Sequence, residues 1–213
     1  MKRRPPLSAA KFYAILDTGY APPERFVELA QAILAGGADV VQVRAKNSNT
    51  ALRIKLLQAV APLCAAANVP LICNDDLTAA LAVPDVGLHI GQDDIPAREA
   101  RLALGPDRIL GLSTHSYAQA QNTLALGDVL SYFAVGPIFK TGTKPDYVPV
   151  GLELVQRVAA LSPSLPWFCI GGINQKNAAQ VRAAGARAIV AVSEVIRASN
   201  PANVVKALRQ TME

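Results

Sequence analysis

At 213 residues, the chain has the length of one domain with a single continuous core. Hydrophobic residues make up 51% of the sequence and charged residues 17%, which excludes general disorder. The net charge of +5 is scattered along the chain and aromatic residues are only 5%, so we expect no nucleic-acid partner; the basic balance suits small anionic metabolites.

Three cysteines and the N-terminus indicate the compartment. Cys64, Cys73 and Cys169 are odd in number and lack CxxC spacing, so we expect reduced core residues and a cytoplasmic protein. Lys11 interrupts any apolar run near the start, which argues against a signal peptide. No apolar stretch approaches the ~18 residues that span a bilayer, so no membrane association is expected. The sequence is compatible with either a monomer or a homo-oligomer.

Short β-branched runs alternate with amphipathic segments rich in alanine and leucine along the whole chain. This alternation predicts repeated βα units around a parallel sheet. An open doubly wound sheet is the main alternative, but it has fewer strands and often a GxGxxG turn, whereas DTGYAPP ends the first strand here. We therefore predict a single-domain (β/α)8 TIM barrel over residues 1–213, with residues 1–10 as a flexible tail. The predicted strands are residues 12–17, 40–46, 71–75, 87–90, 109–113, 132–136, 168–173 and 188–193.

The second predicted strand, VVQVRAK, carries Gln42, Arg44 and Lys46 at every other position. Strand alternation places these three polar side chains on one side and Val41 and Val43 on the other. With the valines toward the helices, the polar set points into the barrel, near the end where barrel active sites lie. Two cations there would attract a phosphate or diphosphate. The alternative, a polar exposed edge strand, has no place in a closed barrel.

Acidic residues follow the next two strands, in LICNDD and HIGQDD. The first ends in Asn74, Asp75 and Asp76, and the second in Gln92, Asp93 and Asp94. Carboxylates from neighbouring strand ends meet at one rim, and magnesium prefers such oxygen ligands together with water and substrate phosphates. Helix N-capping is the alternative for either pair, and for Asp76 and Asp93 it is sufficient.

The last three strand ends carry features of a phosphate site. GPIFKTGTKP follows the sixth strand and offers Thr141, Thr143 and Lys144; residues 140–150 are expected to form a mobile loop. An ordinary turn is the alternative reading of that segment alone. Strands seven and eight end in IGGIN and AVSEVI, and glycines with a helix N-terminus at these places form the recurrent barrel phosphate site. Its expected members are Gly171, Gly172, Val192 and Ser193.

The fifth strand ends in GLSTHS, with Ser113, Thr114 and His115. A histidine at this position could act as an acid or a base. His89, inside the fourth strand, is expected to be a hydrogen-bonded core residue. No nucleophile-elbow motif or Ser-His-Asp spacing supports hydrolase chemistry.

Taken together and in order, QVRAK, NDD, HIGQDD, GLSTH, GPIFKTGTK, GGI and VS closely resemble the thiamine-phosphate synthase family, over nearly the whole chain after Lys11. The resemblance implies a transferase that joins hydroxymethylpyrimidine diphosphate to hydroxyethylthiazole phosphate, with release of diphosphate. It further implies Mg²⁺ on Asp75 and Asp94, and Lys144 as the residue that neutralises the leaving group. By the same resemblance, Gln42, Arg44, Lys46, Asn74 and Ser113 would contact the pyrimidine diphosphate, and Thr141, Thr143, Gly172, Val192 and Ser193 the thiazole phosphate.

Two alternatives remain at this point. A thiazole tautomerase-like isomerase on the same barrel would use His115 to move protons, although it has no diphosphate to neutralise. A non-catalytic metabolite-binding barrel would not need the acidic pair. The chain departs from the family at three positions: Ala45, where a glutamate is common, Asp93 and Cys169. Because the side chain of Ala45 should face away from the barrel interior, we expect the Ala45 departure to alter helix packing and to leave the activity intact.

Overall fold

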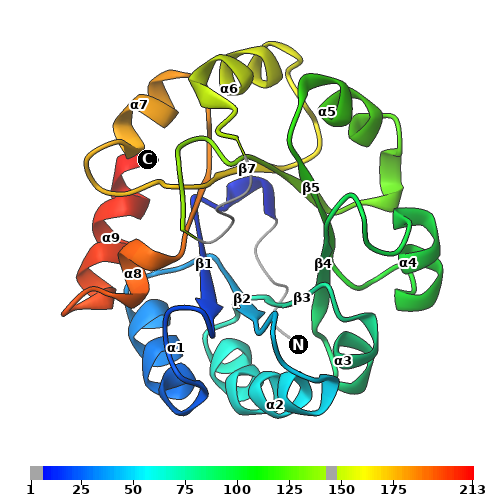
Figure 1. Ribbon diagram of the computed structural model, residues 1–213, viewed down its shortest axis with the longest axis vertical. Helices are drawn as coiled ribbons and strands as arrows, with labels where there is room; N and C mark the ends of the chain where they lie inside the picture. The colour runs from blue at the N-terminus through cyan, green and yellow to red at the C-terminus, as the bar shows by residue number, and fades with distance from the viewer. Residues whose placement is uncertain (1–6, 143–147) are drawn as a thin grey trace.

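A computed structural model describes residues 7–142 and 148–213 of the chain. Within these residues, eight parallel strands pair in chain order and close into a barrel (Figure 1). This confirms the predicted (β/α)8 TIM barrel. The strands are β1 Phe12–Asp17, β2 Val40–Arg44, β3 Leu71–Asn74, β4 Gly87–Ile90, β5 Leu110–Thr114, β6 Tyr132–Val135, β7 Trp167–Ile170 and β8 Ile189–Ala191.

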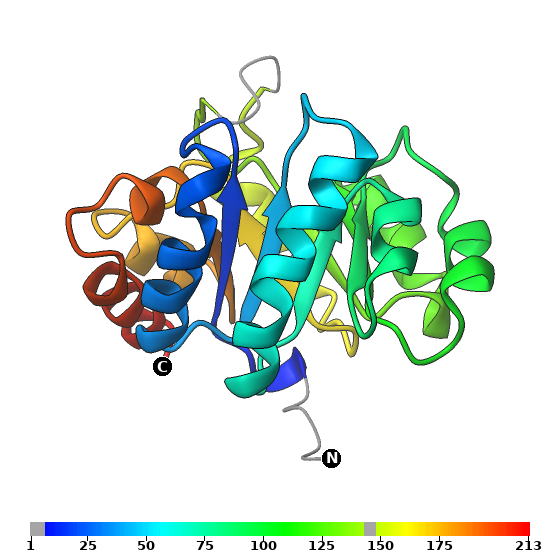
Figure 2. The same cartoon turned by 90° about the horizontal axis from the view of Figure 1, so that it is seen from below.

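Helices surround the strands on the outside (Figures 1 and 2). Figure 1 is a view along the barrel, and Figure 2 shows α1 and α2 from the side. Short 3₁₀ helices stand at Leu7–Ala9, Pro23–Arg25 and Gly127–Val129. The α-helices in the described residues are α1 Phe26–Ala35, α2 Thr50–Ala66, α3 Leu77–Ala82, α4 Ala97–Leu104, α5 Tyr117–Leu124, α6 Gly151–Ala160, α7 Ala178–Ala183, α8 Ser193–Ile196 and α9 Pro201–Thr211.

The strands are buried on both faces because helices cover the outside and side chains fill the inside. Every residue of β1, β4, β5, β6 and β8 is buried. This explains why the strands read as short continuous apolar runs. Glycines end two of the helices: Gly37 follows α1 with φ of 89°, and Gly105 caps α4 with φ of 77°, conformations that favour glycine.

Five strands end earlier than predicted: β2 at Arg44, β3 at Asn74, β6 at Val135, β7 at Ile170 and β8 at Ala191. For β3 and β7 the backbone gives the reason. β3 ends at Asn74 because Asp75 adopts a φ of 62°, and β7 ends at Ile170 because Gly171 and Gly172 have φ values of 104° and 65°. β8 ends at Ala191, and Ser193 opens the separate short helix α8, which the sequence pattern did not distinguish. The polar residues that follow these strands therefore sit on turns, where their side chains face the barrel rim.

The predicted N-terminal tail and the predicted loop after the sixth strand lie only partly within the described residues. Leu7–Ala9 forms a 3₁₀ helix and Ala10 is buried, whereas residues 1–6 of the predicted tail lie outside the described ranges. Residues 143–147 of the predicted mobile loop also lie outside them. In the described part of the chain, no helix has the length and apolar character needed to cross a membrane.

None of the three cysteines forms a disulfide, and all three are buried, as predicted. Burial raises the pKa of the Cys73 thiol to about 12 and also raises that of Cys169. Both thiols therefore stay protonated at neutral pH, which makes them poor nucleophiles and metal ligands. They act as core residues.

Candidate active site

A cavity opens where the carboxyl ends of the strands meet, and it is lined by residues from all eight strands or the turns that follow them. Most of the residues that sequence analysis singled out lie on its wall. Thr143 and Lys144 fall outside the described residues. The predicted residues that line the cavity are Gln42, Arg44, Lys46, Asn74, Asp75, Asp94, Ser113, Thr141, Gly171, Gly172, Val192 and Ser193.

The alternation of β2 has the predicted consequence. Gln42 and Arg44 lie on the cavity wall with Lys46 beyond them, whereas Val41 and Val43 are buried away from it. The two cations thus stand one above the other on the same side of the barrel wall. They make this part of the cavity attractive to a polyanion.

Arg44 is fixed by a neighbour on β1. Asp17 and Arg44 are register partners of the two strands, and Arg44 Nη1 donates to Asp17 Oδ2 at 2.7 Å. Asp17 is only 1% exposed, and its other oxygen accepts from Gly19 N at 2.9 Å. The ion pair therefore holds the guanidinium in place before any ligand arrives. Sequence analysis did not identify Asp17, although Tyr13, Ile15 and Asp17 alternate in the same way as the polar residues of β2.

Asp75 and Asp94 come together across the ends of β3 and β4. Burial raises the pKa of Asp75, and the nearby Asp94 carboxylate raises it further, while Lys46 and Arg44 lower it. The backbone sets this geometry, because Asp75 N donates to His89 O at 2.8 Å and Gly91 N donates to Asp94 Oδ2 at 2.6 Å. Two carboxylates that disfavour each other's ionised form suit a bound cation.

The other two acidic residues differ from this pair. Asp76 is the N-cap of α3, where Oδ1 accepts from Ala79 N at 2.9 Å, so the capping alternative holds for it. Asp93 is exposed on the cavity rim and does not cap α4, whose N-cap is Pro96. The described residues contain no cluster of three or more His, Cys, Asp or Glu side chains suited to a metal. A cation at Asp75 and Asp94 would take its further ligands from substrate and water.

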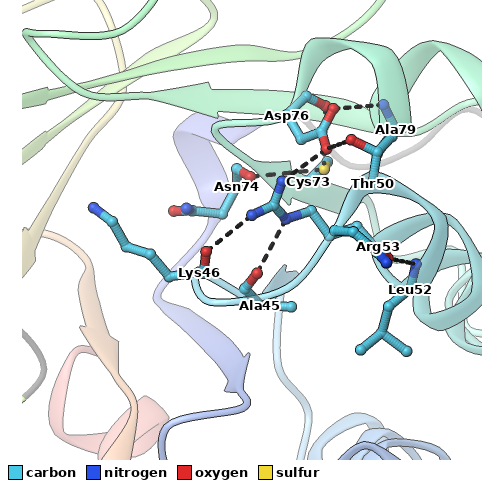
Figure 3. Close-up of polar contacts among 10 residues, drawn as sticks. Ala45, Lys46, Thr50, Leu52, Arg53, Cys73, Asn74, Asp76 and Ala79 are labelled. Atoms are coloured by element: carbon cyan, nitrogen blue, oxygen red, sulfur yellow. Dashed lines mark hydrogen bonds and ion pairs between the residues drawn. The ribbon is translucent and has the colours of Figure 1, made fainter.

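Arg53 on α2 ties the ends of β2 and β3 together behind the cavity wall (Figure 3). Its Nε donates to Ala45 O at 3.0 Å and its Nη2 to Lys46 O at 2.9 Å. Its Nη1 donates to Asp76 Oδ2 at 2.9 Å, and Thr50 Oγ1 donates to the same oxygen at 2.8 Å. Arg53 thus fixes the main chain that carries Lys46 relative to the segment that carries Asn74 and Asp75.

The opposite side of the cavity is built from β6, β7 and β8. Phe139 N donates to Gly171 O at 3.0 Å, and a Cβ at Gly172 would lie 2.6 Å from Lys140 O. The two glycines therefore let the segment after β6 lie directly against the end of β7, which brings Thr141 to the cavity. With Val192 and Ser193, they form a wall of main-chain groups and hydroxyls, and none of these described lining residues carries a carboxylate.

The two histidines occupy different positions. His89 is buried and hydrogen-bonded, as predicted, with Nδ1 2.9 Å from Tyr132 Oη and Nε2 2.9 Å from Ser113 Oγ; it also lines the cavity. His115 Nδ1 lies 2.5 Å from Gly136 O, and His115 lines the cavity as well.

Tyr13 and Tyr132, which connect Gln42 to His89, were not predicted as site residues because tyrosines inside short apolar strands look like core residues.

Known proteins resemble the chain over most of its length. The family model described as thiamine monophosphate synthase matches residues 12–195. A thiamine-phosphate synthase of Roseiflexus sp. (strain RS-1) is 42% identical in a match that covers 92% of this chain and 82% of the Roseiflexus protein. One from Synechococcus sp. (strain WH7803) is 38% identical over 97% of this chain, which spans 58% of that longer relative. The solved thiamine phosphate pyrophosphorylase of Pyrococcus furiosus superposes with a TM-score of 0.86 at 29% identity, over 97% of this chain and 96% of that one. The chain belongs to the thiamine monophosphate synthase family.

Proposed function

We propose that the protein joins 4-amino-2-methyl-5-hydroxymethylpyrimidine diphosphate to 4-methyl-5-(2-hydroxyethyl)thiazole phosphate, giving thiamine phosphate and diphosphate. Family membership supports this reaction. The observation that carries it in this chain is the division of one cavity into two unlike halves. Cations and paired carboxylates line the β2–β4 half, and glycines and hydroxyls line the β6–β8 half. Two anion sites of different chemistry suit the joining of two phosphorylated molecules.

The β2–β4 half is the proposed site of the pyrimidine diphosphate. Arg44 and Lys46 would neutralise diphosphate oxygens, and the Gln42 and Asn74 amides would orient the substrate. Ser113, at the end of β5, would face the pyrimidine ring. The ion pair of Arg44 with the buried Asp17 supports this assignment, because a fixed guanidinium loses little freedom when it binds an anion.

The β6–β8 half is the proposed site of the thiazole phosphate. Main-chain groups of Gly171, Gly172 and Val192 and the hydroxyls of Thr141 and Ser193 would bind the phosphate. The sequence motif GPIFKTGTKP adds Thr143 to this set and assigns Lys144 to the departing diphosphate. Their positions lie outside the described residues.

Mg²⁺ is the proposed cofactor, with Asp75 and Asp94 as its protein ligands. The raised pKa of Asp75 beside Asp94 supports a cation here, since two close carboxylates ionise together only when positive charge offsets their repulsion. When bound, the ion would shield the charge that develops on the leaving diphosphate. Magnesium commonly keeps waters and substrate phosphates as ligands, so two carboxylates are sufficient.

The proposed reaction needs no nucleophile from the protein. The bond between the pyrimidine methylene carbon and the diphosphate oxygen breaks, and its electron pair leaves with the diphosphate. The aminopyrimidine spreads the resulting positive charge, and the thiazole nitrogen then forms the new bond to the methylene carbon. The residues of this chain hold both partners in line and supply positive charge to the leaving group.

Product analysis tests the proposed function directly. Purified protein given both substrates and Mg²⁺ should form thiamine phosphate and diphosphate in equal amounts, and neither when one substrate is omitted. The absence of both products at saturating substrate concentrations would reject the proposal. Rearrangement of a thiazole phosphate without any pyrimidine diphosphate would instead support the isomerase alternative.

His115 separates the synthase from that isomerase. We expect His115→Ala to retain most of the kcat, because the proposed reaction needs no proton transfer at this position. A tautomerase-like enzyme would lose nearly all activity. Steady-state kinetics of the variant, with circular dichroism as a check on folding, make the comparison; a loss of more than about a hundredfold would contradict the assignment.

Arg53 provides a test of how the diphosphate half is held. We expect Arg53→Met to raise the KM for the pyrimidine diphosphate by roughly tenfold, the low end of the effect of removing an orienting outer contact. The KM for the thiazole phosphate should change little, because Arg53 contacts only the β2 and β3 ends. Arg98→Met, on the exposed side of α4, is the matched control. Equal increases for both substrates would indicate general destabilisation.

We further propose a cytoplasmic location, supported by three cysteines that form no disulfide.

A further inference from the structure

A hydrogen-bonded relay of five side chains crosses the interior of the barrel beneath the cavity. Gln42 Nε2 lies 2.5 Å from Tyr13 Oη, and Tyr13 Oη lies 2.9 Å from Tyr132 Oη. Tyr132 Oη is 2.9 Å from His89 Nδ1, and His89 Nε2 is 2.9 Å from Ser113 Oγ. These residues come from β2, β1, β6, β4 and β5, so the relay connects both sides of the barrel.

The direction in which hydrogen bonds are donated along this relay follows from its first member, Gln42. The Gln42 Nε2 group can only donate, so Tyr13 Oη accepts from it. Tyr13 then has one hydrogen left, and Tyr132 Oη is its acceptor. Tyr132 in turn donates to His89 Nδ1. The opposite direction would leave the Tyr13 hydrogen without an acceptor in a fully buried position, a costly arrangement. No buried side-chain nitrogen or oxygen lacks a partner in the described residues.

The surroundings keep both tyrosines protonated and in place. Burial raises the pKa of Tyr13 and of Tyr132, so each hydroxyl keeps the hydrogen that it donates. Phe168 meets both rings edge to face, at centroid distances of 5.4 Å. Gly111 makes room for Tyr132, since a Cβ there would overlap the tyrosine ring. The position of Tyr132 across the barrel thus depends on a glycine on the neighbouring strand.

We infer that this relay holds His89 as the neutral Nε2–H tautomer and thereby makes the Ser113 hydroxyl a hydrogen-bond donor into the cavity. With Nδ1 accepting from Tyr132, His89 carries its hydrogen on Nε2 and donates it to Ser113 Oγ. The Ser113 hydrogen is then directed to an acceptor on the bound ligand. Tyr13, Tyr132 and His89 are positioning residues that act through Ser113.

The identity of that ligand rests on the proposed function. Ser113 lies on the cavity wall between the two halves, and a hydroxyl that accepts from His89 and donates its own hydrogen into the cavity suits an acceptor such as a pyrimidine ring nitrogen or a diphosphate oxygen. The tautomer, in contrast, is a property of the protein without ligand.

Nitrogen NMR of the imidazole rings tests the tautomer without any substrate. The chain has 2 histidines, and the other one makes an internal contrast: His115 Nδ1 faces the Gly136 carbonyl, which only accepts, so His115 should carry its hydrogen on Nδ1. At about pH 8, where free imidazole is neutral, the spectrum should show one ring of each tautomer. His115→Ala assigns the remaining signals to His89. An Nδ1–H tautomer or a cationic ring at His89 would overturn the inference, whether or not the protein is a synthase.

A double-mutant cycle tests whether Tyr132 acts through Ser113. Tyr132→Phe should lower kcat/KM by about tenfold, and adding it to Ser113→Ala should cause no further loss, as expected for residues that act as one unit. Tyr117→Phe removes a hydroxyl from a ring on α5 that stacks under Arg157 outside the barrel, and it should change neither kcat/KM nor the His89 signals. Multiplicative losses in the double variant would show that Tyr132 has only a structural role and would refute the relay.

Discussion

Asp75→Asn is expected to lower kcat/KM by about a thousandfold or more. The charge stabilisation that a bound cation gives to a departing diphosphate is worth several kcal/mol, and each 1.36 kcal/mol is a factor of ten in rate. Asparagine is the informative replacement because Asp75 has a φ of 62°, a conformation that asparagine adopts with little strain. Steady-state kinetics across a range of Mg²⁺ concentrations measure the loss.

Asp85→Asn is the matched control for this change. Asp85 also has a positive φ, 59°, but it lies outside the cavity lining. The same substitution in a similar backbone conformation should therefore leave kcat/KM within about twofold of the wild type, as is usual for changes away from special features. Comparable losses in both variants would contradict the assignment of Asp75.

The pH dependence of stability gives the same variant another readout. The folded protein raises the pKa of Asp75, so between the ordinary and the raised pKa the folded state binds more protons than the unfolded state. Stability of the metal-free wild type should fall as pH rises through this window, relative to Asp75→Asn. At neutral pH the variant should therefore match or exceed the metal-free wild type in urea unfolding, although it is inactive. A variant clearly less stable than the wild type at neutral pH would indicate a structural carboxylate.

Arg44→Met should reduce both activity and stability. It removes a proposed diphosphate contact and leaves Asp17, 1% exposed, as a buried carboxylate without its cation. Breaking a buried pair in this way costs about 3–5 kcal/mol. Urea denaturation of the variant measures the free energy of unfolding, and kinetics measure the accompanying rise in KM for the pyrimidine diphosphate.

The double variant Asp17→Asn/Arg44→Met separates these two effects. Neutralising the carboxylate should recover most of the lost stability but none of the activity. Arg25→Met is the control for an exposed ion pair, with Glu28 on the same surface, and should leave the free energy of unfolding nearly unchanged. A double variant as unstable as Arg44→Met alone would show that the unpaired carboxylate is not the cause.

The sequence predicted the barrel and most of the cavity wall because both follow from short-range patterns. The alternation of Gln42, Arg44 and Lys46 fixes their common side once the strand exists, and parallel strands carry the residues after them to one rim. The strand ends were less predictable. They depend on single backbone conformations such as those of Asp75 and Gly171, which a hydrophobic pattern does not encode.

Residues that act through other residues were the ones that sequence analysis missed. Asp17 and Tyr132 lie within apolar runs. Asp17 meets Arg44 on the neighbouring strand β2, and Tyr132 meets His89 on β4, so no spacing within one strand links either residue to its partner. Arg53 is similar, because its three acceptors belong to two strand ends that meet in space. A search for polar residues that alternate with apolar ones inside each strand would have found Asp17.

The most direct test of the central claim is the two-substrate reaction with and without a chelator. With saturating pyrimidine diphosphate, thiazole phosphate and Mg²⁺, the wild-type protein should release diphosphate and thiamine phosphate in equal amounts. A chelator in excess should stop both, and added Mg²⁺ should restore both. Product formation that is unchanged by the chelator would contradict the metal assignment, and no product under any of these conditions would contradict the account of the cavity as a whole.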